Sequence, residues 1–293
     1  MPASALALVI LAGLIHASWN IAAKKAGGDV RFAAFTGIVM MVFWAPLGIW
    51  LGKDQLPGWG RAEWLLLAAS AGLHTLYYIV LLRGYRKADL TVVYPLARGS
   101  GPLLSSLAAI MFLGEEISTL GAAGITGVVA GVFLIAGGPG LWRATDDPER
   151  RRRIHKGMVY GLITGVFIAS YTVVDAYAVK FLLMSPILLD YIGNLLRLVV
   201  LVPSVLRDLP TAAILWQRQW RYAVFVGIIS PVSYVLVLYA MQTAPLSHVA
   251  PAREISMLFA ALIGGQLLGE GDRWLRLLGA GFIAAGVMAL AVG

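Results

Sequence analysis

The segment LTVVYPLARGSGPLLSSLAAIMFLGEEISTLGAAGITGVVAGVFLIAGG, residues 90 to 138, recurs as PLSHVAPAREISMLFAALIGGQLLGEGDRWLRLLGAGFIAAGVMALAVG, residues 245 to 293. The two copies align without a gap and share an arginine, a Leu-Gly-Glu turn and spaced glycines. The shared residues include Arg98 and Arg253, Gly114 and Gly269, Glu115 and Glu270, Gly124 and Gly279, and Gly131 and Gly286. We interpret the chain as a duplicated unit. Repeated sets of apolar helices around a midplane site are typical of membrane transporters.

The composition of the chain indicates that its solvent is lipid. Hydrophobic residues make up 59% and charged residues 13% of the 293 residues, and the mean hydropathy is +0.81. Soluble proteins carry about 25% charged residues. The chain contains no cysteine, which excludes disulfides, thiolate metal sites and thiol nucleophiles. We expect no metal, cofactor or catalytic residue.

Ten apolar runs approach the length of about 20 residues that a helix needs to cross the hydrocarbon core. They cover residues 5 to 23, 31 to 51, 63 to 84, 91 to 113, 119 to 138, 157 to 179, 184 to 206, 221 to 242, 247 to 268 and 274 to 292. We therefore predict an all-α integral membrane protein with ten transmembrane helices. We place a first five-helix repeat at residues 1 to 138, a charged linker at 139 to 156 and a second repeat at 157 to 293. The first run lacks a basic segment before it, so we interpret it as a retained span.

Five spans per repeat make the second repeat enter the membrane from the side opposite to the first, so the repeats are predicted to be inverted. Seventeen Lys and Arg residues fall in one set of alternate connections and helix ends, against Lys53, Arg61 and Lys180 in the other set. The larger set is Lys24, Lys25, Arg31, Arg83, Arg86, Lys87, Arg143, Arg150, Arg151, Arg152, Arg153, Lys156, Arg207, Arg218, Arg221, Arg273 and Arg276. We interpret the net charge of +8 as this topology signal and not as a nucleic-acid surface. It predicts a bacterial inner membrane protein with a cytoplasmic linker and both termini in the periplasm.

Polar residues inside the predicted spans are candidates for a cavity, because lipid rarely tolerates them. In the first span, His16 and Asn20 share a helical face and flank Trp19. In the third span, His74 and Tyr78 have the same spacing. Interhelical hydrogen bonding is the alternative to a cavity role for His16 and Asn20, and simple packing is the alternative for the tyrosine of the third span.

Arg98 and Arg253 occupy equivalent positions in the two copies of the repeat. Tyr94 shares the face of Arg98, and Glu254 follows Arg253 directly. Neighbouring residues of a regular helix point about 100° apart, so we expect Arg253 and Glu254 to find separate partners. The candidate anionic partners of the arginines are Asp175, which shares a face with Tyr171, and Asp190.

Polar, proline, glycine and glutamate residues form further patterns in and between the predicted spans. Asp190, Asn194 and Arg197 form a polar stripe. Pro231, three residues before Tyr234, indicates either a hinge or cavity wall or a proline of the kind that is common in membrane helices. The glycines near 124 to 131 and 279 to 286 predict close helix packing, within or between subunits. We expect the carboxylates of Glu115 and Glu270 to cap the N-terminus of the helix that follows each of them.

The paired Leu-Gly-Glu turns with their glycine-rich helices, and His16-Ala17-Ser18-Trp19-Asn20 in the first span, resemble EamA-type proteins of the drug/metabolite transporter superfamily. The resemblance covers essentially the whole chain. It implies a ten-helix secondary transporter with a central cavity, and YddG-like exporters of aromatic amino acids are one known branch. The family includes members with cytoplasmic termini, which differs from the orientation that the charges of this chain predict.

The residues predict a substrate with a carboxylate and an apolar part. Together with the exporters that the resemblance implies, this predicts export of amino acids, aromatic ones among them, or of similar small amphipathic metabolites by alternating access. The chain contains no G-x-x-x-x-G-K-[ST] loop for ATP, so a gradient would supply the energy. The expected partners are a small-molecule substrate and the lipid bilayer, with no nucleic acid. The candidate substrate-binding residues are His16, Trp19, Asn20, His74, Tyr78, Tyr94, Arg98, Tyr171, Asp175, Tyr234, Arg253 and Glu254.

Two other classes of function compete with transport. An intramembrane serine hydrolase would use Ser100, in Gly-Ser-Gly, with His74 or His248 as its base. A non-transporting scaffold or receptor is the third class, but the soluble segments are too short for a signalling domain.

Overall fold

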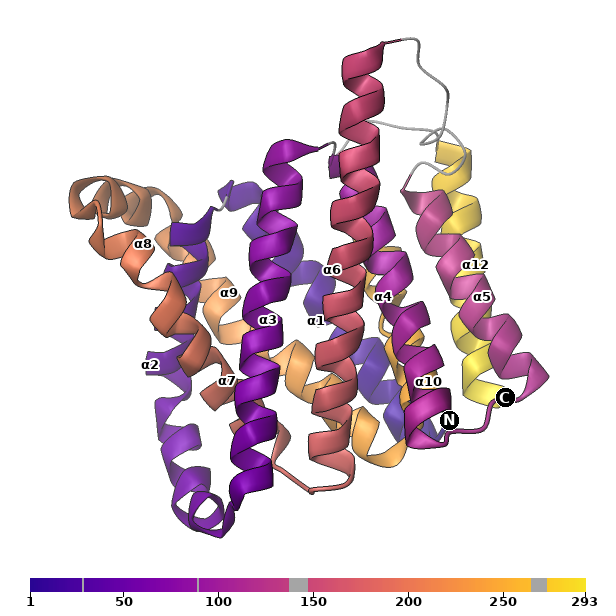
Figure 1. The fold of residues 1–293 in the computed structure, drawn as a ribbon, viewed down its shortest axis with the longest axis horizontal. Helices are drawn as coiled ribbons and strands as arrows, with labels where there is room; N and C mark the ends of the chain where they lie inside the picture. The colour runs from indigo at the N-terminus through magenta and orange to yellow at the C-terminus, as the bar shows by residue number, and fades with distance from the viewer. Residues whose placement is uncertain (28, 89, 137–146, 265–272) are drawn as a thin grey trace.

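The computed structural model describes residues 1–27, 29–88, 90–136, 147–264 and 273–293, and these residues form helices and no strands (Figure 1). The N-terminal half contains five long helices and one short 3-10 helix. These are α1 (Ala3–Ala26), α2 (Val30–Gln55), η1 (Leu56–Gly58), α3 (Arg61–Lys87), α4 (Leu90–Leu113) and α5 (Thr119–Ile135).

The C-terminal half contains the same number of spans but more helical segments. Its helices are α6 (Pro148–Lys180), α7 (Pro186–Leu201), α8 (Pro203–Leu206), α9 (Leu209–Thr243), α10 (Leu246–Ala252), α11 (Ile255–Gly264) and α12 (Arg273–Val292). Helices α10 and α11 together occupy the place of the single span predicted at 247 to 268.

The described helices confirm an all-α integral membrane protein. Eight of them are long and apolar enough to cross a bilayer, and the 17-residue helix α5 is a shorter apolar helix. The interrupted pair α10 and α11 supplies the remaining span. Interruption is tolerated at membrane depth where the backbone is buried in protein or lines a cavity.

Two helices begin well before the predicted apolar runs because acidic caps start them. Helix α6 begins at Pro148, where the Asp147 carboxylate accepts the amide N–H of Glu149. Helix α9 begins at Leu209 after Asp208, whose carboxylate accepts the Thr211 amide. Hydropathy locates the apolar part of a helix, whereas a cap fixes where its backbone starts.

The packing of the helices is symmetric under exchange of the two halves. Helix α3 packs on α6 and α1 packs on α9, which are equivalent pairs, while α2 meets α7 and α5 meets α12. Both termini lie at one end of the bundle, and α6 starts at the opposite end from α1 (Figure 1). The two sets of helices are therefore inverted relative to each other, as five spans per half require.

Glycines hold α5 against α12 within one chain. A Cβ atom at Gly131 would lie 2.6 Å from the Gly279 carbonyl oxygen, and one at Gly279 would lie 2.7 Å from that of Gly131. Gly124 and Gly286 make the same reciprocal approach, at 2.8 and 2.7 Å. Small residues let helix backbones come this close in lipid, so the glycine pattern serves packing within the chain.

The main apolar core fills the bundle near the end that holds the termini. It includes Val9, Met184, Leu246 and Leu290, which lie close to the N-terminus, the connection between α6 and α7, the start of α10 and the C-terminus. The two larger cavities described below reach toward the other end of the bundle.

Candidate functional site

A break in the second repeat shapes the centre of the protein. Helix α10 ends at Ala252, just after Pro251, and α11 begins at Ile255. Pro251 cannot donate to the Ser247 carbonyl, which instead accepts a hydrogen bond from Ser106 Oγ on α4 at 3.0 Å. Across the break the amide of Glu254 bonds to the Pro251 carbonyl, a tighter spacing than in an α-helix.

This break brings together the charges that a regular helix would separate. Arg253 Nε lies 3.8 Å from Glu254 Oε1, and Arg98 from α4 places a guanidinium nitrogen 2.9 Å from Glu254 Oε2. The expectation that Arg253 and Glu254 have separate partners was wrong, because it assumed an unbroken helix. Arg98 also donates to Ser256 Oγ at 3.0 Å.

The charges of this cluster do not cancel. Glu254 is fully buried, and its carboxylate forms the short ion pair with Arg98 and the longer one with Arg253. Arg253 Nε is buried and has no hydrogen-bond partner among the described residues. Two guanidinium groups around one carboxylate leave an excess of one positive charge beside a cavity.

That cavity has a volume of about 180 Å³ and lies between the two halves. Eight of the twelve predicted site residues line it: His16, Trp19, Asn20, Tyr94, Arg98, Tyr171, Tyr234 and Arg253. Glu254 lies behind the two arginines. We call this space the central cavity; its lining reaches Tyr85 and Tyr94, near the end of α3 and the start of α4.

The aromatic walls of the central cavity are held in place by their neighbours. Trp19 Nε1 donates to Ser233 Oγ at 3.2 Å, and the Trp19 ring meets the His16 ring edge to face. The Tyr171 ring stacks on His74, with centroids 3.8 Å apart. Fixed rings provide a preformed apolar surface beside the charged cluster.

A second cavity of about 340 Å³ adjoins the central cavity. It shares Trp19 and Tyr77 with the central cavity and is lined further by Tyr78, Asn194 and Arg197. The structure thus places Tyr78 away from the other tyrosines of the predicted site. Most of the remaining lining is apolar, contributed by α1, α2, α7 and α9.

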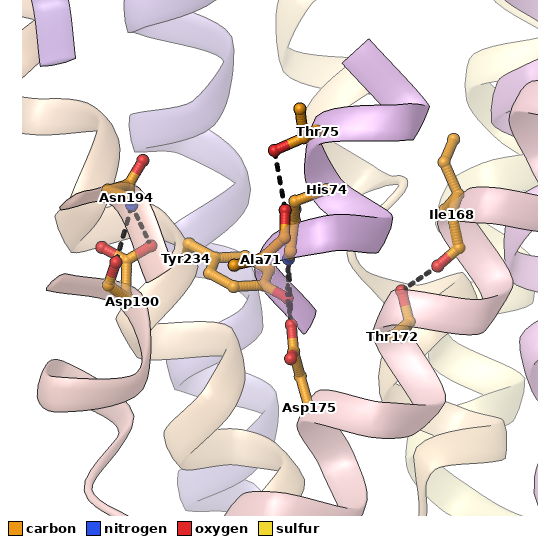
Figure 2. Close-up of polar contacts among 9 residues, drawn as sticks. All are labelled: Ala71, His74, Thr75, Ile168, Thr172, Asp175, Asp190, Asn194 and Tyr234. Carbon is orange, nitrogen blue, oxygen red and sulfur yellow. Dashed lines mark hydrogen bonds and ion pairs between the residues drawn. The ribbon is translucent and has the colours of Figure 1, made fainter. Parts of the chain in front are cut away.

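Asp175 and His74 meet in a third, small cavity of about 30 Å³ (Figure 2). Asp175 Oδ2 lies 3.0 Å from His74 Nε2 and accepts a hydrogen bond from the Tyr234 hydroxyl at 2.5 Å. Asp190, which accepts from Asn194 Nδ2, lines the same cavity. The expectation that Asp175 or Asp190 pairs with Arg98 or Arg253 was wrong, because Glu254 takes that place.

Several cavity residues were missed as site residues from the sequence. Tyr77, Tyr85, Ser233 and Ser256 all line the central cavity. Tyr77 and Tyr85 lie eight positions apart on α3, a spacing that puts them near one helical face, and this signal was available. Ser256 was visible only as a small residue on the face of Arg253.

The structure does not form the serine hydrolase pair. Ser100 Oγ donates to the Leu96 carbonyl of its own helix, and His74 is engaged with Asp175 and Tyr234. His248 Nδ1 lies 3.3 Å from Ser247 Oγ, its immediate neighbour. Among the described residues neither histidine contacts Ser100, so a nucleophile with its base is not assembled there.

Glu115 caps a helix, but in the other half of the protein. Its carboxylate accepts the amides of Leu246 and Ser247, both at 2.8 Å, and pairs with Lys180 Nζ at 3.2 Å. Ser118, and not Glu115, caps α5, the helix that follows. Glu270, its counterpart in the repeat, lies outside the described residues. Glu115 therefore ties together α4, α6 and α10 at the end that holds the termini.

We expect Glu115→Ala to lower the free energy of unfolding by about 0.5–2 kcal/mol, the usual effect of losing a helix cap. Burial opposes ionisation of Glu115, but the two backbone donors and Lys180 lower its pKa below the ordinary value. A carboxyl group with a lowered pKa stabilises the fold at pH values above its ordinary pKa, and this stabilisation is lost as the pH falls through the lowered pKa. In detergent, the difference in unfolding temperature between wild type and Glu115→Gln should become smaller as the pH is lowered. Glu116→Ala, at an exposed neighbour, is the control, and an equal effect there would contradict this role.

Each half of the chain separately matches a known protein family. The sequence pattern of the EamA-like transporter family matches residues 3–137 and again residues 155–292. The chain belongs to the EamA-like transporter family. This membership confirms the resemblance to the drug/metabolite transporter superfamily and makes the protein a membrane transporter of small molecules.

One curated protein and one solved structure are similar to this EamA-like transporter. An "uncharacterized transporter in cobO 3'region" from Sinorhizobium sp is 30% identical over 107 residues, which are 34% of this chain and 75% of that protein. One solved crystal structure has a TM-score of 0.75 to this chain at 15% identity, covering 100% of this chain and 98% of the other. This second likeness supports the fold alone.

Proposed function

We propose that this EamA-like transporter exports amino acids, aromatic ones among them, or similar small amphipathic carboxylates by alternating access. The observation that carries the proposal is the positive charge left over at Arg253, which lines the central cavity next to the aromatic wall. A substrate carboxylate would balance this charge through a charge-assisted hydrogen bond. The apolar part of the substrate would lie against Trp19, Tyr171 and Tyr234.

The size of the central cavity supports a small substrate. Its volume of about 180 Å³ is below the range of about 300–1,000 Å³ that is usual for drug-sized ligands. Of the twelve residues expected to bind substrate, we retain the eight that line this cavity and give Glu254 the role of holding the two arginines. His74, Tyr78 and Asp175 lie outside it.

The arrangement of core and cavity supports export. The core fills the end that holds the termini, while the central cavity reaches toward the ends of helices rich in Lys and Arg. We propose that this Lys- and Arg-rich end faces the cytoplasm of a bacterial inner membrane, as positive charges in short loops favour. The cavity would then be accessible from the cytoplasm, which is the loading state of an exporter.

Counterflow in proteoliposomes tests the proposal without any assumption about coupling. Purified wild-type protein is reconstituted with unlabelled L-phenylalanine inside, and tritiated L-phenylalanine is added outside. We expect transient accumulation of label that excess L-phenylalanine or L-tryptophan suppresses. Phenethylamine, which lacks the carboxylate, should compete at least about 10-fold less well, given about 1.5–3 kcal/mol for a hydrogen bond to a charged group. Equal competition by phenethylamine would refute carboxylate recognition, and no counterflow with any proteinogenic amino acid would refute the substrate class.

A further inference from the structure

A buried carboxylate lies next to the central cavity without belonging to its lining. The Asp175 side chain is 1% exposed, and its Oδ1 atom is buried with no hydrogen-bond partner among the described residues. Its other oxygen contacts His74 from α3 and Tyr234 from α9 (Figure 2). A carboxylate in this position is costly, and one oxygen is left free to bind a proton.

The residues around Asp175 favour a proton over a metal ion. The described residues contain no group of three or more His, Cys, Asp or Glu side chains that could hold a metal. Arg197 lines the same small cavity, and its positive charge repels a divalent metal ion more strongly than it repels a single proton. The groups that contact Asp175 or line its cavity are His74 from α3, Tyr234 from α9, and Asp190 and Arg197 from α7. Tyr171, on the same helix as Asp175, stacks on His74. Arg98 on α4 and Arg253 after α10 are directed to Glu254 and the central cavity.

The small cavity around Asp175 is linked to both larger cavities by shared lining residues. The small cavity, at about 30 Å³, exceeds the 10–15 Å³ or so that one water molecule needs. Asn194 and Arg197 line both it and the 340 Å³ cavity, so polar groups continue from one space to the next. On the other side, Tyr234 lines the central cavity while its hydroxyl donates to Asp175.

We propose that Asp175, positioned by His74 and Tyr234, binds and releases one proton in each transport cycle and thereby couples the movement of substrate to a proton gradient. The proton comes from water at one face of the membrane, binds at Asp175 Oδ1 and returns to water at the other face. Only O–H bonds form and break, so no further reactant is needed. Tyr234 communicates the protonation state to the substrate cavity, because a protonated Asp175 accepts its hydrogen bond less strongly than a carboxylate does. This coupling rests on the transport function proposed above.

Gradient-driven uptake separates coupling from transport itself. Proteoliposomes with valinomycin and equal potassium on both sides receive tritiated L-phenylalanine under a pH gradient of either polarity. In wild type one polarity should raise accumulation above the level without a gradient. Asp175→Asn should lose this response entirely while keeping counterflow, which requires no net proton movement. Asp190→Asn, in the same cavity but bonded to Asn194, is the matched control and should keep the response.

Each alternative result is decisive. A wild type that shows counterflow but responds to neither polarity, or that responds to a sodium gradient instead, would overturn the proton site and leave the transport proposal intact. A response that survives in Asp175→Asn, or that is lost in Asp190→Asn, alone or together with Asp175→Asn, would also overturn it. If Asp175→Asn gives too little folded protein, His74→Gln provides the same test from the other helix, with loss of the gradient response and retained counterflow expected. Absence of counterflow in wild type would instead count against the transport proposal.

Discussion

Glu254→Gln is expected to destabilise the folded protein by about 3–5 kcal/mol, because it removes the one carboxylate that the described residues contribute to a buried charge cluster. Arg98 and Arg253 would remain at the break between α10 and α11 without a counter-charge, both largely buried at 16% and 12% side-chain exposure. Thermal unfolding in detergent, together with the yield of monodisperse protein, measures the loss.

A second substitution tests the cause of that loss. Because Arg98 lies 2.9 Å from Glu254 and Arg253 only 3.8 Å, Arg98→Gln combined with Glu254→Gln should recover more stability than Arg253→Gln combined with Glu254→Gln. Residues in direct contact show such non-additivity, whereas independent sites do not. Simple addition of the single effects in both double variants would show that Glu254 acts through something other than these ion pairs.

Arg253→Gln is expected to impair recognition of substrate far more than folding. The variant keeps the ion pair between Arg98 and Glu254, so the cluster becomes neutral and its unfolding temperature should stay near that of wild type. The loss of one hydrogen bond to a charged carboxylate, about 1.5–3 kcal/mol, corresponds to a rise in KM of roughly 10- to 100-fold.

The measurement is counterflow of labelled L-phenylalanine over a range of concentrations. Arg221→Gln is the control, since Arg221 is exposed on α9 and lies over the Trp220 ring, 5.5 Å from its centroid. An unchanged KM in Arg253→Gln would remove the central argument for a carboxylate substrate. A parallel collapse of the unfolding temperature would assign Arg253 to stability instead.

Individual residues show how far the sequence reaches into the site. His16, Trp19 and Asn20 were predicted to line a cavity, and they do so. Polar residues within a membrane span normally face the interior of the bundle, because exposing them to lipid is costly. His74 and Asp175 were predicted on the same ground, but they meet each other in a separate cavity. Helical spacing places residues on a face and does not say which neighbouring helix that face meets.

The carboxylate that pairs with the two arginines could not be identified from the sequence. Asp175 and Asp190 were reasonable candidates from charge alone, yet the acid that pairs with Arg98 is Glu254. The helix break that makes this contact possible follows Pro251. Pro251 has no N–H for the Ser247 carbonyl, which instead accepts a hydrogen bond from Ser106 in the other half of the protein. Pro251 was visible in the sequence, but its consequence depends on Ser106, which lies 141 residues before Ser247.

The sequence by itself determined the ten apolar spans, their inverted duplication and the membership of the EamA-like family. The spans could be predicted because each helix in lipid must form its own backbone hydrogen bonds and must be long enough to cross the hydrocarbon core. Both requirements appear in the sequence as long runs of apolar residues. Only the tertiary structure decided which carboxylate balances Arg98 and Arg253, that Glu115 caps a helix of the opposite half, and that Asp175 lies in a cavity of its own. These outcomes depend on contacts between distant helices, which hydropathy and helical period do not encode.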